Sequence, residues 1–213
     1  MNNLVREARN KSLPWDHATV GELPDWVLTY RPEQVQAIND ILNAYSRGIR
    51  LVVLDAPTGS GKTLIAETVR RLLAPGTCLY VCTSKTLQTQ FATDFEDAAV
   101  LMGRSNYPTW FDPSITAADC TKVKGEDGEF VCKWCPVVSE CEYEVAKREA
   151  LSSPLAVLNT AYFLTETNGP GRFKGKGFVV LDEADVLEGE LMGYVGVSIS
   201  PRRIKQHELG EPS

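Results

Sequence analysis

The chain has 213 residues, of which 43% are hydrophobic and 23% are charged, the composition of a globular protein with one sizeable core. Its formal net charge of −6 argues against a protein that coats polyanions with its whole surface, but it is compatible with a local basic groove. No apolar run approaches the roughly 20 residues that cross a bilayer, and no signal segment opens the sequence, so we expect a cytoplasmic protein without a membrane partner.

Buried strands and amphipathic helices alternate along most of the sequence. The expected elements are, in order, a helix opened by Pro32 and ended by Gly48, strand 51–54, helix 62–73, strand 77–83, helix 86–101, strand 155–158, a helical turn at 161–164, strand 178–181 and a helix over 184–192. Apolar strands separated by helices are typical of a parallel sheet with a helical layer on each face. The sequence therefore predicts the α/β class.

One segment interrupts this alternation. Residues 103–145 show little periodicity, but they carry four cysteines and six aromatic residues. A structureless loop of this length inside a compact domain is uncommon, so we expect a folded insertion. We divide the chain into 1–102, the first part of the α/β domain, 103–150, a cysteine-rich insertion, and 151–213, the remainder of the α/β domain.

A glycine-rich segment after the first expected strand has the spacing of a phosphate-binding loop. It reads Ala-Pro-Thr-Gly-Ser-Gly-Lys-Thr from Ala56 to Thr63, with Ala56 where the strict pattern has Gly. Gly59 and Gly61 let backbone amides approach phosphate oxygens, and Lys62 supplies positive charge for the β- and γ-phosphates. The residues expected to bind ATP here are Pro57, Thr58, Gly59, Ser60, Gly61, Lys62 and Thr63.

An acidic pair follows the last expected strand, in the string Asp-Glu-Ala-Asp that begins at Asp182. We expect Asp182 to hold Mg²⁺ together with the hydroxyl of Thr63, and Glu183 to orient or deprotonate the attacking water. With Lys62, these two carboxylates form the predicted catalytic set. Because both segments follow strands of one parallel sheet, they should face the same crevice.

The two strings resemble those of superfamily 2 helicases. DEAD-box RNA helicases share them, but those enzymes carry Pro-Thr-Arg-Glu-Leu after the second strand, where this chain has Thr-Ser-Lys-Thr-Leu-Gln-Thr-Gln-Phe from Thr83 onward. That string, Arg31-x-x-Gln34 and the segment Asn159–Leu164 resemble the DinG/XPD branch of DNA helicases, although that branch usually has His at the position of Asp185. The resemblance implies a RecA-like, P-loop version of the α/β fold.

The same resemblance implies further contacts. Gln34 would read the adenine edge, with assistance from Arg31. The loop after the second strand would contact DNA phosphates at a helix N-terminus. The expected DNA contacts are Thr83, Ser84, Lys85, Thr86 and Gln90, and the expected partner is single-stranded or forked DNA.

The cysteines divide into two groups. Cys78 and Cys82 lie in an apolar strand and are expected to be core residues. The other four can surround one metal centre, and their spacing alone admits tetrahedral zinc as well as an iron–sulfur cluster. They lie where the DinG/XPD family carries its four-cysteine domain, so the resemblance implies a [4Fe–4S] cluster. Its ligands would be Cys120, Cys132, Cys135 and Cys141.

Together these features predict the ATP-binding and ATP-hydrolysing half of a DNA helicase, which the resemblance makes Mg²⁺-dependent and 5′-to-3′. Such motors need a second RecA-like domain, whose arginine finger contributes on the order of 10³–10⁵ in rate in related enzymes. We therefore expect a second such domain or chain to be required, and weak or absent turnover by this chain alone. Two alternatives stay open: a non-catalytic nucleotide- or DNA-binding module, and a zinc-stabilised P-loop NTPase that does not act on DNA.

Overall fold

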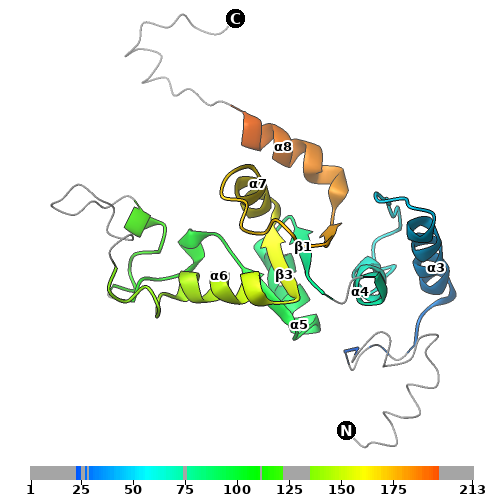
Figure 1. Ribbon diagram of the computed structural model, residues 1–213, viewed down its shortest axis with the longest axis horizontal. Coiled ribbons are helices and arrows are strands. Elements are labelled where there is room, and N and C mark those ends of the chain that lie inside the picture. Colours follow the sequence, from blue (N-terminus) through cyan, green and yellow to red (C-terminus); the bar gives the residue numbers. More distant parts are fainter. Residues whose placement is uncertain are drawn as a thin grey trace, which may run out of the picture.

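The fold is built around a sheet of four parallel strands (Figure 1). It is seen in a computed structural model that describes residues 23–24, 27, 29–73, 76–110, 112–121 and 135–196. The strands are β1 (Cys78–Cys82), β2 (Ala98–Leu101), β3 (Leu155–Asn159) and β4 (Phe178–Leu181), in the spatial order β2-β3-β1-β4. Because all four run in the same direction, their carboxyl ends share one edge of the sheet.

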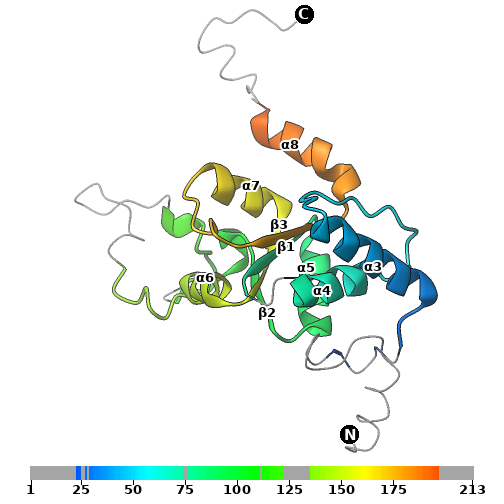
Figure 2. The same ribbon diagram turned by 45° about the vertical axis from the view of Figure 1, so that its right-hand side comes forward.

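Helices cover both faces of this sheet (Figure 2). They are α3 (Pro32–Ser46), α4 (Lys62–Leu73), α5 (Lys85–Asp94), α6 (Glu142–Ser152), α7 (Thr160–Asn168) and α8 (Leu187–Val195), with short 3₁₀ turns η1 (Arg104–Asn106), η2 (Asp119–Thr121) and η4 (Ala184–Val186). α4 and α5 pack on one face, and α6 and α7 pack on the other. The predicted α/β sheet of parallel strands with helices on both faces is therefore confirmed.

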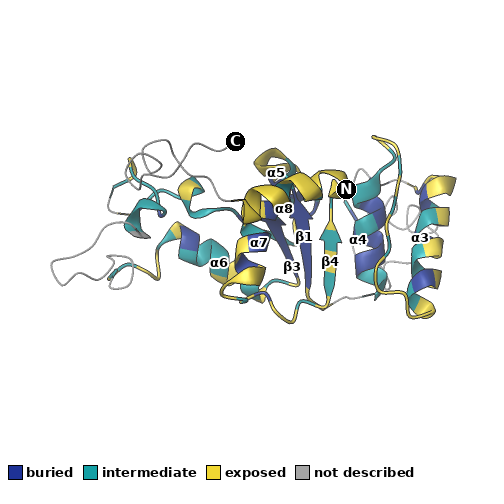
Figure 3. Cartoon of the chain, turned by 90° about the horizontal axis from the view of Figure 1, so that it is seen from above, coloured by how far each residue is buried: buried dark blue, intermediate teal, exposed yellow. Residues whose placement is uncertain are grey.

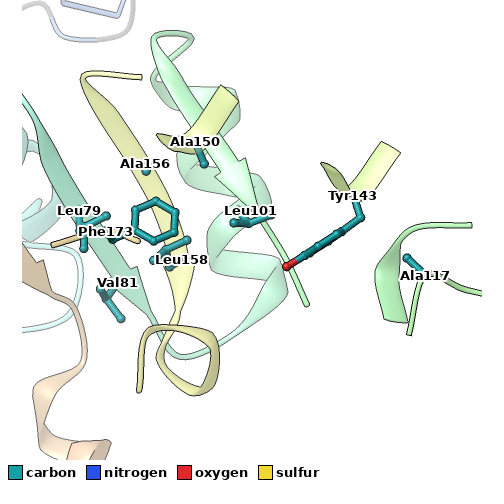
Figure 4. Close-up of a cluster of buried hydrophobic side chains, with 9 residues drawn as sticks. All are labelled: Leu79, Val81, Leu101, Ala117, Tyr143, Ala150, Ala156, Leu158 and Phe173. Carbon is teal, nitrogen blue, oxygen red and sulfur yellow. The ribbon is translucent and has the colours of Figure 1, made fainter. Parts of the chain in front are cut away.

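The two central strands are buried because a helical layer covers each of their faces. All of β1, and all of β3 except Asn159, is buried. On one face, the ring of Tyr80 packs on Phe91 of α5, with ring centroids 4.1 Å apart. On the other face, Val81 and its neighbours form a cluster with Ala150 of α6 (Figure 4). None of the helices that the structure describes is long and apolar enough to cross a membrane.

Helix α3 packs on α4, on the side away from the sheet (Figure 3). Ile38 of α3 is fully buried against Ile65 and Val69 of α4, which confirms the apolar faces predicted for both helices. The ring of Tyr45 lies 6.1 Å from that of Phe178, so α3 also contacts the last strand. This packing fixes the N-termini of α3 and α4 near each other, and the glycine-rich loop leads into the second of them.

The predicted strand 51–54 is the main difference from expectation. Residues 51–57 form no strand, and Leu51 and Val53 are 80% and 81% exposed instead of buried. The neighbouring sheet edge, β4, is paired only with β1 in the described structure. An apolar run becomes a buried strand only where another strand pairs with it. In the described structure residues 51–57 pair with no strand, and only Leu54 of the run packs on the cluster between α3 and α4.

The predicted helix 86–101 is also wrong in its second half. Helix α5 ends at Asp94, and Ala98–Leu101 forms β2, which pairs in parallel with β3. Phe95 is 1% exposed and packs on Phe91, with ring centroids 4.8 Å apart, so it anchors the turn between the two elements. A four-residue apolar run fits a helix turn and a strand equally well, and the pairing with β3 decides between them.

The predicted insertion is described only in part, because Phe111 and residues 122–134 lie outside the described residues. Pro108 and Thr116 form an isolated antiparallel bridge. Helix α6, which the prediction assigned to the end of the insertion, packs through Ala150 against β2 and β3. Its packing makes α6 part of the layer that covers the sheet.

Candidate nucleotide and metal site

The glycine-rich loop 57–61 leads directly into the N-terminus of α4. Gly59 and Gly61 have φ values of +79° and +81°, a region that other residues enter at a cost of roughly 1–2 kcal/mol. A Cβ on Gly61 would lie 2.4 Å from Nε2 of Gln34, so no side chain fits there without moving that amide. Helix α4 is 12 residues long, and its free backbone amides and dipole favour an anion at this end.

Two side chains from the start of α3 brace this loop. Arg31 donates from its guanidinium to the carbonyl oxygen of Gly59 at 2.9 Å. Gln34 donates from Nε2 to the carbonyl oxygen of Ser60 at 2.9 Å, while its Oε1 accepts from the backbone N–H of Arg31 at 2.9 Å. Both residues expected at the adenine therefore hold the loop in this structure, and their contact with a base stays a prediction.

Lys62 folds back over its own loop. Its ammonium donates to the carbonyl oxygen of Ala56 at 2.9 Å and lies 3.5 Å from that of Pro57. The positive charge is thus held inside the curve of the loop, where the predicted phosphates would lie. Among the described residues, Ser60 carries one of two buried side-chain polar atoms without a hydrogen-bond partner, its Oγ. An unpaired buried hydroxyl in an anion loop is free to bind a ligand.

The predicted magnesium ligands meet at a residue that the sequence reasoning missed. Tyr80, in the middle of β1, donates from its hydroxyl to Oδ2 of Asp182 at 2.8 Å. The side chain of Thr63 lies near the same phenol. Burial, followed by the nearby Asp182 carboxylate, raises the pKa of Tyr80 far above its usual value, so the phenol stays protonated. Asp182 therefore contacts the hydroxyl of Tyr80, and Thr63 lies in the same neighbourhood.

The second acid of the pair has an unusual backbone. Glu183 has φ +51° and ψ +47°, the only positive φ of a non-glycine residue in the described chain. Its carboxylate accepts a short hydrogen bond from the hydroxyl of Thr83, at the end of β1. Non-glycine residues in this conformation cost about 1–3 kcal/mol and concentrate at functional sites. The side chain is exposed, so burial does not impose this conformation.

The segment expected to contact DNA begins α5. Ser84 is the N-cap, and its Oγ accepts from the backbone N–H of Leu87 at 3.3 Å. Lys85, Thr86 and Gln90 are exposed, as a nucleic-acid surface requires. Gln88, which the sequence reasoning passed over, is fully buried and donates from Nε2 to carbonyl oxygens of β2 and β3 at 3.2 and 3.4 Å. It anchors the helix so that the exposed residues face solvent.

Three of the four predicted cluster ligands line one pocket. Cys120, Cys135 and Cys141 surround it together with Trp110 and apolar side chains, and Cys132 lies outside the described residues. No group of three or more His, Cys, Asp or Glu side chains in the described ranges is close enough to hold a metal ion. None of the described cysteines is in a disulfide. The expected core residues Cys78 and Cys82 are fully buried, which confirms that interpretation.

Charged groups that the sequence reasoning did not identify also lie at this pocket. The guanidinium of Arg104 lies 4.2 Å above the ring of Tyr143 and 3.3 Å from the carboxylate of Glu144. Lys147 contacts the same carboxylate at 2.5 Å. The sulfur donors and apolar walls of the pocket are of the chemical kind that surrounds thiolate-bound metals, although the described side chains alone do not form a metal-holding group.

Comparison with known proteins identifies one protein family. The sequence profile described as type III restriction enzyme, res subunit, matches residues 27–185, which include the glycine-rich loop and the acidic pair. Among solved structures, the chain is similar to one described as truncated XPD, with 18% sequence identity and a TM-score of 0.47. That match covers 75% of this chain and 54% of the other, so the chain spans about half the length of that structure. No curated protein matches the sequence.

Proposed function

The chain belongs to the family described as type III restriction enzyme, res subunit, and from this premise we propose that it is the ATP-binding half of a DNA helicase of the DinG/XPD type. Family membership makes it a helicase-type, ATP-dependent motor domain. Dependence on Mg²⁺, translocation along single-stranded DNA in the 5′-to-3′ direction and the DinG/XPD branch are the finer parts of the proposal. The motif strings described above support them.

One observation carries the proposal. The hydroxyl of Tyr80 donates to Asp182 and lies near the side chain of Thr63, although these two residues come from segments far apart in the sequence. A hydroxyl and a carboxylate are oxygen donors of the kind that Mg²⁺ takes alongside phosphate oxygens and waters. The loop that leads into Thr63 has the backbone form of an anion site. A nucleotide triphosphate with its metal fits this donor set.

In this mechanism the residues of the chain mainly position the nucleotide and the attacking water and polarise the phosphates. The loop amides and the N-terminus of α4 would bind the phosphates, and Lys62 would exchange its contact with Ala56 for the β- and γ-phosphate oxygens. Glu183 would orient the attacking water and accept its proton. When bound to Thr63 and Asp182, Mg²⁺ would offset charge on the phosphates. Arg31 and Gln34 would keep the loop in shape while the nucleotide enters.

Nucleotide binding tests this proposal directly. A fluorescent ATP analogue titrated with Mg²⁺ should bind the chain, and Lys62→Ala should weaken binding by about tenfold or more, because a charge-assisted contact is worth about 1.5–3 kcal/mol. Lys174→Ala is the matched control, since it removes the same charge from an exposed loop before β4. Equal affinities for the two variants, or no binding by the unaltered chain, would refute the nucleotide site.

DNA binding needs its own experiment. Lys85→Ala should weaken binding of a single-stranded oligonucleotide several-fold and reduce the slope of log K against log salt by about 0.7, the value expected for one lost phosphate contact. Lys174→Ala again serves as the control. An unchanged salt slope for Lys85→Ala would remove the DNA role from the segment 83–86 at the start of α5.

A metal centre at the cysteine pocket is the third part of the proposal. Cys120, Cys135 and Cys141 would bind it together with Cys132, and a [4Fe–4S] cluster would cross-link a segment with little aliphatic core of its own. Protein purified without oxygen should be brown and contain iron and sulfide. A colourless protein with one zinc would favour the zinc-stabilised alternative, and a protein without metal would refute the centre.

The proposed motor needs a second RecA-like domain, in the same or another chain, to complete the site. The isolated 213-residue chain should therefore show little ATPase activity, with or without single-stranded DNA. Steady-state phosphate release measures this. Prompt, DNA-stimulated turnover by the chain alone would contradict the requirement. Location in the cytoplasm stays a prediction from the sequence.

A further inference from the structure

We propose that Tyr80 is the positioning residue of the magnesium site: its hydroxyl holds the Asp182 carboxylate in the orientation in which it can contact a divalent cation. This inference rests on the proposed nucleotide function and assigns a role within that site. Tyr80 lies in β1, not in the glycine-rich loop or the acidic string. The arrangement of strands brings it to the site.

The phenol ring of Tyr80 is held rigidly. Tyr80 is 3% exposed, and its ring packs on Phe91 at a centroid distance of 4.1 Å. Phe91 in turn packs on Phe95 at 4.8 Å. The three rings come from β1, α5 and the turn that follows α5. Since interior side chains are close-packed in rotamer minima, the hydroxyl at the end of this stack has one position.

The hydroxyl is placed by strand register. Tyr80 pairs with Val180 of β4, and the chain continues from β4 into Asp182, whose backbone N–H donates to the carbonyl oxygen of Val81 at 2.8 Å. Side chains two residues apart on a strand point to the same face. Asp182 therefore leaves β4 on the face from which the Tyr80 ring rises, and the two side chains meet at 2.8 Å.

Both oxygens of the Asp182 carboxylate are held by donors. Oδ2 accepts from Tyr80, and Oδ1 accepts from the backbone N–H of Glu183 at 3.0 Å. These two bonds fix the rotation of the carboxylate plane. An ionised carboxylate has about four lone-pair sites, so two bonds leave capacity for a cation or its coordinated water. Mg²⁺ demands near-ideal octahedral geometry, and a fixed carboxylate meets that demand without reorganisation.

A buried tyrosine can also have a purely structural role, and the chain offers a matched control for it. The hydroxyl of Tyr162 in α7 pairs with that of Tyr143 at 2.9 Å, on the opposite face of the sheet. Tyr80→Phe and Tyr162→Phe each delete one hydroxyl from the interior and leave the ring in place. Only the first deletion removes a contact with a proposed metal ligand.

The test measures metal binding, which needs no turnover. Mn²⁺ suits the same oxygen donors as Mg²⁺, and its free concentration can be followed by electron paramagnetic resonance in the presence of the chain and ADP. Tyr80→Phe should weaken Mn²⁺ binding to the nucleotide complex about tenfold, the size expected for a lost hydrogen bond to a charged acceptor. Affinity for ADP in EDTA should stay within about twofold of the unaltered chain, because the hydroxyl of Tyr80 donates to Asp182 and to no residue of the loop 57–61 that would bind the phosphates.

The outcomes separate this inference from the function on which it rests. If Asp182→Asn abolishes Mn²⁺ binding while Tyr80→Phe matches Tyr162→Phe, the nucleotide site stands and the role of Tyr80 is wrong. If the unaltered chain binds no Mn²⁺ with ADP, the proposed function falls and this role falls with it. If Tyr80→Phe weakens ADP binding in EDTA as much as Mn²⁺ binding, its effect is structural and the positioning role is refuted.

Discussion

Replacing Gly61 with alanine should damage the nucleotide loop more than the same change at two other glycines. The alanine must adopt φ of +81°, which costs roughly 1–2 kcal/mol. Its Cβ would also lie 2.4 Å from Nε2 of Gln34, so that amide must leave the carbonyl of Ser60 that it now contacts at 2.9 Å. Loss of this hydrogen bond adds about 0.5–1.5 kcal/mol. The expected loss of unfolding free energy is therefore about 1.5–3.5 kcal/mol.

Two glycines serve as controls for the backbone part of this cost. Gly59 and Gly48 have φ of +79° and +84°, and a Cβ on either would meet nothing within 4 Å. Alanine there should cost only the roughly 1–2 kcal/mol of the backbone conformation. Gly48 follows α3, at the other end of that helix from the loop. Gly48→Ala should therefore leave affinity for the ATP analogue unchanged.

Urea denaturation measures the three free energies, and titration with the fluorescent ATP analogue measures the affinities. Gly61→Ala should be the least stable variant by about 1 kcal/mol, the share assigned to the Gln34 contact. It should also bind the nucleotide more weakly than Gly48→Ala does. Three equal losses of stability would show that Gln34 moves away without cost, and that its contact with Ser60 does not hold the loop.

Three further predictions concern buried groups and, by contrast, the exposed residue Val53. Glu67 is 1% exposed and accepts hydrogen bonds from Arg70 at 2.8 and 2.5 Å and from Arg71 at 2.6 Å. Glu67→Ala leaves the buried Arg70 short of its main partner, so it should lower the unfolding free energy measured in urea by about 3–5 kcal/mol. A loss below about 1 kcal/mol would contradict this. Burial raises the pKa of Cys78 to about 11 and that of Cys82 to about 12. Iodoacetamide at about pH 8 should therefore alkylate neither thiol in the folded chain, and it should alkylate both in urea. Mass spectrometry measures the alkylation. Val53 is 81% exposed, so Val53→Ser should change the unfolding free energy by less than about 0.5 kcal/mol. Leu158→Ala, in the buried strand β3, should cost about 2–5 kcal/mol. A large loss for Val53→Ser would place that segment in the sheet after all.

The fold could be predicted from sequence where local pattern and tertiary packing agree. Helix 62–73 and strand 178–181 match α4 and β4 residue for residue, because an apolar face and a Pro-Gly stop define the first and a bounded apolar run defines the second. The family match also confirms the predicted helicase-type motor domain. In each case the evidence lies within the segment itself or in a motif with fixed spacing.

The errors arise where pairing with another strand decides which secondary structure a segment forms. Residues 51–54 are as apolar as β4, yet they remain unpaired, because an apolar run does not state which strand it will lie beside. Ala98–Leu101 fits a last helical turn by composition, and its pairing with β3 makes it β2. Both errors concern pairing between distant segments, which periodicity within one segment does not encode.

The candidate site divides along the same line. Lys62, Thr63, Asp182 and Glu183 could be selected because their motifs have fixed spacing. Tyr80 could not, since a tyrosine within an apolar strand reads as a core residue. One signal was present: its hydroxyl is the only one in β1, and a buried hydroxyl needs a partner. Identifying Asp182 as that partner requires the register of β1 with β4, which the sequence does not supply.

Residues in β1 and directly after it contact both acids of the pair, Asp182 and Glu183. These contacts link the segment expected to bind DNA to the acidic pair. Tyr80 contacts Asp182, and three residues later Thr83 contacts Glu183. Thr83 directly precedes Ser84, the N-cap of α5, at the segment expected to bind DNA. The αL backbone of Glu183 costs about 1–3 kcal/mol, so its position depends on contacts such as the one from Thr83. A ligand that moved the loop 83–86 would therefore act on Glu183 through one hydrogen bond, without any longer route through the core.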